Sequence, residues 1–202
     1  MRKKHSGFTL MELMVTLAVA SVLLGLAVPN FRDFIRNSRL TSAANDLIGA
    51  LNAARTEAIK RQLPVAVCAT GDATASPPVC SGGAYTAWVV WVDANNNWIP
   101  DNVAAEQVLV RHETLDPSVL VRVDGAETGV VKFRPSGFAA DPSGGFVPTS
   151  NIVICDVRGS AATAGGTSAA RALLITATGR ARVTRDKGEI DTALGLIGDT
   201  CP

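Results

Sequence analysis

The chain has 202 residues and a formal net charge of +1, and three of its basic residues, Arg2, Lys3 and Lys4, lie in a short N-terminal run. Without that run the remainder carries about −2, so a basic body that coats nucleic acid is not the default, and such a partner would need a local patch. This length suits one globular domain with an appendage.

The N-terminal region changes abruptly from basic to apolar. Residues 1–7 (MRKKHSG) are short and polar, whereas residues 8–28 (FTLMELMVTLAVASVLLGLAV) contain a single charged residue, Glu12. At about 1.5 Å per residue, residues 8–28 form a helix of about 31 Å, the thickness of a bilayer core. A secretory signal has a shorter apolar run followed by a small-residue cleavage site, and no such site occurs here. Basic residues before the span predict a cytoplasmic N-terminus, with the chain beyond residue 30 outside.

Pro29 is expected to end or kink this apolar helix, because proline lacks a donor N–H and clashes with the preceding turn. An amphipathic helix is then predicted over residues 29–62, and Pro64 stops it. Charged residues, among them Arg39, Asp46 and Arg55, occupy its other faces. Its apolar positions recur at steps of three and four, and they are Leu40, Ala44, Leu47, Ile48, Leu51, Ala54, Ala58 and Ile59.

Residues 63–202 are expected to form a β-rich domain, since the apolar period becomes strand-like and turn-rich stretches separate the runs. The run Trp88–Val92 is apolar on both faces and is therefore placed centrally in the sheet. The segment Gly159–Ala170 is expected to be a flexible loop. The expected strands are Val65–Ala69, Ala84–Val92, Gln107–Glu113, Val119–Val123, Val130–Arg134, Ile152–Asp156, Arg171–Ala177 and Arg180–Thr184.

Four cysteines fit no zinc-binding spacing and favour disulfides in an oxidising compartment. Three pairings are possible. The favoured one joins Cys68 to Cys80 and Cys155 to Cys201, because each bond closes a segment that otherwise lacks anchors. The second bond would close a loop of about 46 residues and contribute roughly 4 kcal/mol in the chain-entropy picture. The alternative is four free thiols buried as small hydrophobic groups.

The strongest signal is the junction Ser6–Leu13, where a basic leader, a glycine, a phenylalanine and a carboxylate four residues later open a bilayer-length helix. This constellation resembles the type IV prepilin signal, which type IV pilins share with the pseudopilins of type II secretion. The resemblance implies that a prepilin peptidase cleaves between Gly7 and Phe8 and methylates the new amine of Phe8. It also implies anchoring in the inner membrane, with the following domain in the periplasm.

Glu12 requires its own explanation, because a carboxylate inside hydrocarbon is costly unless it has a partner. The resemblance implies that Glu12 pairs with the N-terminal amine of a neighbouring subunit and so guides assembly. The alternative is a glutamate near the interface that merely snorkels to water.

Three further segments resemble the GspH/FimT branch of minor pilins. They are Trp88–Asn97 (WVVWVDANNN), Val131–Gly137 (VKFRPSG) and Leu174–Arg180 (LITATGR), which match that branch's W-x-V-F-x-D-x-N, F-x-x-x-G and G-R segments in the same order. Trp91 departs from the phenylalanine of the branch. The resemblance implies an α+β, type IV pilin-like fold in which a long N-terminal helix, half transmembrane and half amphipathic, packs on an antiparallel sheet.

Asp93, Asn95 and Asn97 imitate the opening of a calcium loop. However, Trp98 occupies the place of the required glycine and no bidentate glutamate follows, so Asx-type turns that cap the strand are the favoured interpretation. With His112 as the single histidine outside the leader, no base and nucleophile can be nominated. We therefore expect no catalytic residue, no metal and no cofactor.

Arg180 and Arg182 lie at an expected hairpin turn, and Arg171, Arg185 and Lys187 are close in sequence. In FimT members of the branch, a G-R-x-R motif at this place is associated with DNA binding during natural transformation. The resemblance thus makes double-stranded DNA a candidate partner of these five residues. The alternative is a solvated hairpin whose glycine serves the turn.

The working hypothesis is a non-catalytic minor pilin at or near the tip of a type IV pilus, with other pilins and the prepilin peptidase as partners. Two alternatives stay open. One is a GspH-like pseudopilin of a type II secretion system, and the other is a membrane-tethered periplasmic enzyme.

Overall fold

The computed structural model describes residues 7–80, 86–101, 105–123, 129–140, 149–163, 165–198 and 200–201. Residues 1–6 of the expected leader lie outside these ranges. The chain divides into two compact units, Met1–Ser38 and Arg39–Pro202.

A single helix, α1 (Leu10–Arg61), forms the long N-terminal helix that was expected. Of the two outcomes expected at Pro29, an end or a kink, the end does not occur, because α1 continues through this residue. Proline removes one backbone hydrogen bond and costs about 3 kcal/mol. The regular helical turns on both sides of Pro29 compensate for this loss, so α1 continues through the proline. One of them carries an added hydrogen bond from the Asn30 side chain to the Leu26 oxygen, at 2.9 Å.

Within the second unit, α1 is amphipathic as predicted. Most of the predicted apolar positions are buried, but Ile48 is only partly buried and Ile59 is 43% exposed. Gln62, with φ of 55°, lies just beyond the end of the helix and is followed by the expected break at Pro64. The buried positions on this face are Leu40, Ala43, Ala44, Leu47, Ala50, Leu51, Ala54 and Ala58.

The described strands form two antiparallel sheets rather than the single sheet expected. Sheet A has the order β3-β2-β1-β5-β6, and sheet B has the order β4-β7-β8-β9. Each expected strand occurs with shifted ends, although residues 84 and 85 lie outside the described ranges. The strands are β1 (Val65–Thr70), β2 (Ala87–Val92), β3 (Val108–His112), β4 (Leu120–Val123), β5 (Val130–Phe133), β6 (Ala139–Ala140), β7 (Thr149–Cys155), β8 (Thr167–Thr176) and β9 (Ala181–Asp186).

β8 corrects the expectation of a flexible loop over Gly159–Ala170. The strand begins at Thr167, and Ser168, Ala169 and Ala170 are buried. Small residues without β-branching favour a loop in isolation, but the packing of neighbouring elements overrides that preference.

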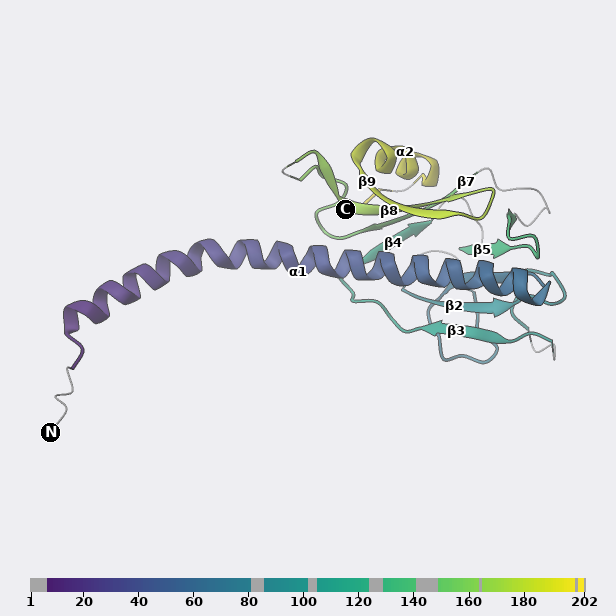
Figure 1. Ribbon diagram of the computed structural model, residues 1–202, viewed down its shortest axis with the longest axis horizontal. Coiled ribbons are helices and arrows are strands. Elements are labelled where there is room, and N and C mark those ends of the chain that lie inside the picture. Colours follow the sequence, from purple (N-terminus) through teal and green to yellow (C-terminus); the bar gives the residue numbers. More distant parts are fainter. Residues whose placement is uncertain are drawn as a thin grey trace. The chain divides into compact units, whose positions relative to one another are not determined.

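The main core lies between α1 and the inner faces of both sheets, with side chains from β1, β2, β7 and β8. In Figure 1, β2 and β3 lie on one side of the second half of α1 and β8 and β9 lie on the other. A long helix that buries one face against two sheets supplies the common core that joins them.

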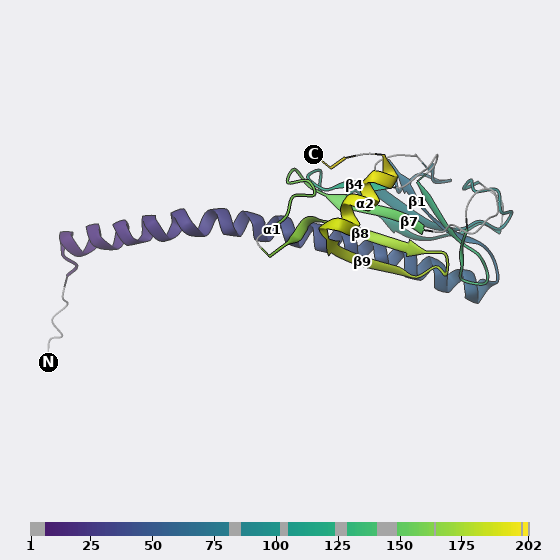
Figure 2. The ribbon, with the colours of Figure 1, turned by 90° about the horizontal axis from the view of Figure 1, so that it is seen from above.

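A second helix, α2 (Lys187–Ile197), was not predicted. It begins after Asp186, whose carboxylate accepts a hydrogen bond from the Glu189 N–H, and it ends at Gly198, with φ of 69°. Ile190, Ala193 and Leu194 pack on Val153 and Ala172, on the face of sheet B away from α1. Figure 2 shows α2 lying over β7 and β8. An aspartate at the N-cap, a glutamate three residues later and a glycine at the C-terminus are the signals that could have predicted it.

The placement of Trp88–Val92 in the centre of a sheet is confirmed, because β2 lies between β3 and β1 and all its residues are buried. Trp88 and Val90 pack toward α1. Val89 and Trp91 point the other way and pack with Ala73, which belongs to the Cys68–Cys80 segment. This segment, which had no expected role, thus covers the outer face of sheet A.

Candidate functional site

The predicted processing bond between Gly7 and Phe8 lies directly before the start of α1, in backbone that is not helical. Thr9 caps the helix, since its Oγ1 accepts a hydrogen bond from the Glu12 N–H at 3.2 Å. Glu12 therefore lies in the first turn, where the helix dipole favours a carboxylate.

The first part of α1 exposes apolar side chains around its whole circumference. Residues 10–28 are exposed throughout wherever a side chain is described. The helix is long and apolar enough to cross a bilayer, judged by length and composition. So large an exposed apolar surface is unfavourable in water.

Arg182 is held by Glu189 of α2 in a bidentate ion pair. Its two terminal nitrogens lie 3.0 and 2.6 Å from the carboxylate oxygens. The hydrogen bond from Arg182, assisted by one involving Thr184, lowers the pKa of Glu189 to about 2. The second arginine of the G-R-x-R motif is thus already matched by an acid, which the sequence interpretation missed.

The five basic residues do not form the single strip that was expected. Arg171 is 4% exposed and points toward α1, donating to the Thr41 hydroxyl at 3.3 Å. Including it in a DNA-contacting strip is therefore a wrong expectation, because alternate residues of a strand face opposite sides and Arg171 is on the inner side of β8.

The remaining basic residues also differ in their surroundings. Arg185 lies three residues beyond Arg182 in β9, so the two point to opposite faces. Lys187 pairs with Asp191 at 2.6 Å. Arg180 is exposed, and among the described residues no acid pairs with it. Arg180 is therefore the most available cation of the motif.

The loop at residues 93–101 is closed around a lysine rather than a metal ion. The buried Asp93 carboxylate accepts backbone hydrogen bonds from Asn97 and Trp98 at 3.0 and 3.1 Å. The interpretation as Asx-type turns is confirmed at Asn95 and Asn97, whose side-chain oxygens each accept from the N–H two residues later, at 3.1 and 2.8 Å. Lys132 forms an ion pair with Asp93, donates to the Asn96 side chain and lies 3.9 Å from the centre of the Trp98 ring. Burial lowers the pKa of Lys132, and the contact with Asp93 partly offsets this.

No group of three or more metal-ligating side chains was found in the described part of the chain. The ammonium of Lys132 contacts the Asp93 carboxylate, which a calcium ion would need as a ligand. Lys132 therefore supplies the positive charge that balances Asp93 in this loop.

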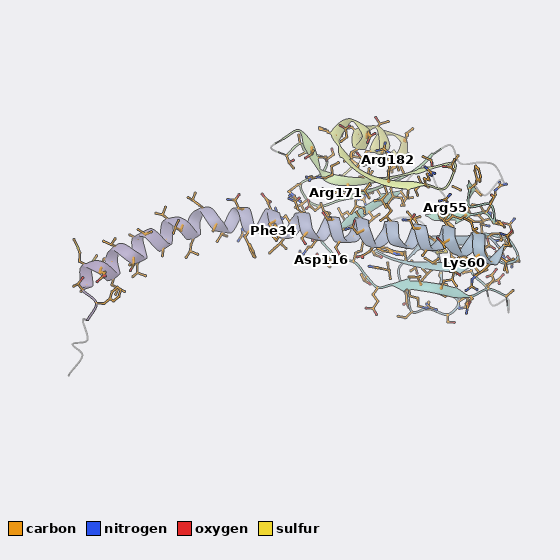
Figure 3. The ribbon with its side chains drawn as sticks, in the orientation of Figure 1. Phe34, Arg55, Lys60, Asp116, Arg171 and Arg182 are labelled. Atoms are coloured by element: carbon orange, nitrogen blue, oxygen red, sulfur yellow. A yellow bond between two sulfur atoms is a disulfide. The ribbon has the colours of Figure 1, made fainter. Side chains whose placement is uncertain are left out.

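The two glycine motifs of the sequence meet in space. Gly137 and Gly179 have φ of 79° and 74°, and a Cβ added to Gly179 would lie 2.1 Å from the Gly137 oxygen. Arg55 of α1 donates from Nε to that same oxygen at 3.0 Å. Figure 3 shows Arg55 on the second half of α1. The sequence gives no sign that these turns touch, because they are far apart in the chain.

Both disulfides are present with the favoured pairing. Cys68 is bonded to Cys80 and Cys155 to Cys201, and the described residues contain no free cysteine. The first bond holds the segment over the outer face of sheet A. The second ties the chain after α2 to the end of β7.

A capped apolar helix that continues onto two antiparallel sheets defines the type IV pilin-like class. A family model described as type II transport protein GspH matches residues 43–179, and a model of the prokaryotic N-terminal methylation motif matches residues 2–28. Because the first match spans more than half of the chain, the chain belongs to the family of the type II transport protein GspH.

Individual relatives are more distant. A type IV major alpha-pilin of Moraxella bovis is 23% identical over 152 residues, which are 66% of this chain and 96% of that protein. A fimbrial protein of Pseudomonas aeruginosa is 35% identical over 57 residues, 28% of this chain and 36% of that protein. Among solved structures, the type IV minor pilin FimU of Pseudomonas aeruginosa is similar with a TM-score of 0.48 and 17% identity, covering 77% of this chain and 94% of FimU.

Proposed function

We propose that the chain is a non-catalytic minor pilin that is cleaved between Gly7 and Phe8, methylated on Phe8 and assembled through α1 at or near the tip of a type IV pilus. Before assembly it lies in the inner membrane with its N-terminus in the cytoplasm and its β-rich domain in the periplasm. The observation that supports this is the non-helical junction at Gly7–Phe8, which directly precedes a capped helix. From Leu10 to Val15, the exposed side chains of this helix are apolar except for Glu12.

Mass spectrometry of the chain from a host with its prepilin peptidase tests the processing. The expected product begins at Phe8 and carries one added methyl group. Replacing Gly7 with a bulkier residue, as in Gly7→Leu, should leave the leader attached and serves as the control. An intact Met1 in the unsubstituted chain, or cleavage beyond residue 28, would overturn the proposal.

The alternative is a GspH-like pseudopilin of a type II secretion system, and the description of the matching family favours it. The curated relatives, described as a type IV pilin and a fimbrial protein, favour the pilus. Shearing pili from cells and probing them for this chain separates the two. The pilus proposal expects the chain in sheared pili and its loss when the pilus assembly genes are deleted. A chain that depends only on the secretion genes would establish the alternative.

We propose DNA binding as a second function, carried by Arg180 and Arg182. The supporting observation is that Arg180 is exposed beside the turn at Gly179 and has no acid partner among the described residues. Arg182 can reach a phosphate only by leaving Glu189. The expected affinity is therefore low, non-specific and strongly salt-dependent.

Fluorescence anisotropy with a DNA duplex at low salt tests this function. Glu189→Gln removes the charge that competes for Arg182 and should strengthen binding several-fold. Asp191→Asn, which removes an acid that pairs with Lys187 instead, is the matched control and should change binding less. Arg180→Ala combined with Arg182→Ala should abolish most binding. Equal binding by that double variant would exclude the function.

A further inference from the structure

The turn that precedes Arg180 packs against a second arginine, Arg55 of α1. Arg55 donates from its Nε to the Gly137 oxygen at 3.0 Å. The same Nε lies 3.1 Å from the position that a Cβ added to Gly179 would occupy. Arg180 is the next residue after Gly179, so its backbone begins beside the Arg55 guanidinium. Two arginines from segments that are remote in the chain are therefore neighbours at this turn.

The terminal nitrogens of Arg55 are available to a ligand. Within the described part of the chain, the bond from Nε to Gly137 is the one hydrogen bond that this side chain forms. Neither terminal nitrogen is among the buried side-chain atoms that lack a partner, so both reach solvent. The bond at Nε already restricts the side chain, so less rotamer freedom remains to be lost when an anion binds. Arg55 is therefore a pre-positioned donor.

The two arginines are not neutralised by the acids that the structure describes. The acid nearest to Arg55 along α1 is Glu57, which lies about 200° further around the helix axis. Glu57 already pairs with Lys60 and Arg61, at 3.2 and 2.8 Å. Neither Arg55 nor Arg180 forms an ion pair with a described carboxylate. The positive charge at the turn is therefore available to an anion from outside the domain.

Arg182, the second arginine of the G-R-x-R motif, is less available than Arg55. Both of its terminal nitrogens are bonded to the Glu189 carboxylate, at 3.0 and 2.6 Å. Arg182 must give up a bidentate ion pair to bind a phosphate, whereas the terminal nitrogens of Arg55 give up only water. A planar guanidinium matches the oxygens of a phosphate. Arg55 is thus better suited than Arg182 to act beside Arg180.

We propose that Arg55 of α1 and Arg180 of the turn form a phosphate clamp that binds the backbone of duplex DNA. The inference rests on the proposed DNA binding and adds to it a binding residue that lies outside the G-R-x-R motif. The terminal nitrogens of Arg55 donate to one phosphate while Arg180 donates to another. The bond from the Arg55 Nε to Gly137 holds the two arginines together. Arg182 makes a further contact only when it leaves Glu189.

Fluorescence anisotropy tests the phosphate clamp, with a labelled duplex and the full-length chain in detergent micelles at several salt concentrations. Arg55→Gln is the informative variant, because its side-chain amide can donate to the Gly137 oxygen in place of Nε but carries no charge. It should weaken binding by about tenfold, the size expected for one charge-assisted hydrogen bond. The slope of log K against log salt should become shallower by about 0.9, which corresponds to one phosphate contact.

Two further variants separate the charge of Arg55 from its structural role. Arg55→Lys keeps the charge and should keep the salt slope of the unsubstituted chain. Lys60→Gln is the matched control, because it removes another exposed cation of α1, about 140° around the helix axis from Arg55. Figure 3 shows Lys60 and Arg55 on different sides of α1. Lys60→Gln should change the affinity less than twofold. The melting temperatures of all three variants should match that of the unsubstituted chain.

The same titrations separate this inference from the proposed function. An Arg55→Gln variant that binds like the unsubstituted chain, or weakens without a change in salt slope, overturns the phosphate clamp. If Arg180→Ala combined with Arg182→Ala still abolishes binding in that case, the proposed DNA function stands without Arg55. An unsubstituted chain that does not bind duplex DNA at low salt overturns both proposals.

Discussion

Arg55 donates a hydrogen bond from its Nε to the backbone oxygen of Gly137, and this bond of 3.0 Å joins the helix to the turn after β5. The same oxygen faces the Gly179 backbone so closely that no side chain fits between them. Beside this contact, the Ala139 N–H donates to the Ala177 oxygen at 3.0 Å and links the two sheets. The F-x-x-x-G and G-R segments therefore form one junction between α1, sheet A and sheet B.

Gly179→Ala should destabilise the domain by about 3 kcal/mol, because the new Cβ would collide with backbone and the positive φ disfavours an L-residue. Gly137→Ala should cost less, since its closest contact is the flexible end of Ile59. Gly195→Ala, in α2 with open space around it, should instead stabilise by about 0.5–1 kcal/mol. Urea unfolding of residues 30–202 measures all three. Equal losses at Gly179 and Gly195 would contradict the close contact.

Lys132→Met should destabilise the domain by about 3–5 kcal/mol, because it leaves the buried Asp93 carboxylate without its cation. Adding Asp93→Asn should recover part of that loss in a double-mutant cycle. The unsubstituted domain should melt at the same temperature with calcium or with a chelator, since Lys132 supplies the positive charge. A calcium-dependent rise in its melting temperature would contradict this account of the loop.

The Arg182–Glu189 pair should make stability depend on pH in acid. The pKa of Glu189 is lowered from 4.5 to about 2, so the contribution of the pair is complete above pH 4.5 and is lost as the pH falls through about 2. Arg182→Ala should raise the pKa of Glu189 toward its ordinary value, as measured by carboxyl NMR titration. The stability difference between the two proteins should shrink over the same pH range. An unchanged pKa of Glu189 would show that the pair does not persist in solution.

Glu12→Ala should insert in the membrane normally, because it removes an unfavourable charge from the apolar helix, but should enter filaments poorly. Thr9→Ala removes the hydroxyl that accepts from the Glu12 N–H and serves as the control for helix capping alone. Quantitative immunoblots of membranes and sheared filaments measure both steps. Normal incorporation of the Glu12→Ala variant into filaments would show that the Glu12 carboxylate is not needed for assembly.

Sequence patterns predicted the elements that depend on local chemistry. The helical period from Leu40 to Ala58, the strand of Trp88–Val92 and the Asx-type turns after Asp93 all occur in the structure. Their signals lie within a few residues of each other, so local propensity and packing agree.

Features that depend on distant contacts could not be predicted in the same way. The burial of Arg171 follows from the approach of Thr41, which is remote in sequence. The ion pair between Arg182 and Glu189 depends on α2, a short helix that was not predicted from its capping residues Asp186 and Gly198. The division into two sheets likewise depends on which strands meet around α1.

The two disulfides also impose an order on maturation. Cys68 and Cys80 are separated by 12 positions, whereas Cys155 must wait for a partner 46 positions later. If the domain is exported as proposed, with its N-terminal side first, the Cys68–Cys80 bond can form while β9 and α2 are still crossing. The second bond would then form only after Cys201 has crossed. On that topology, the redox state of Cys155 would report whether translocation is complete.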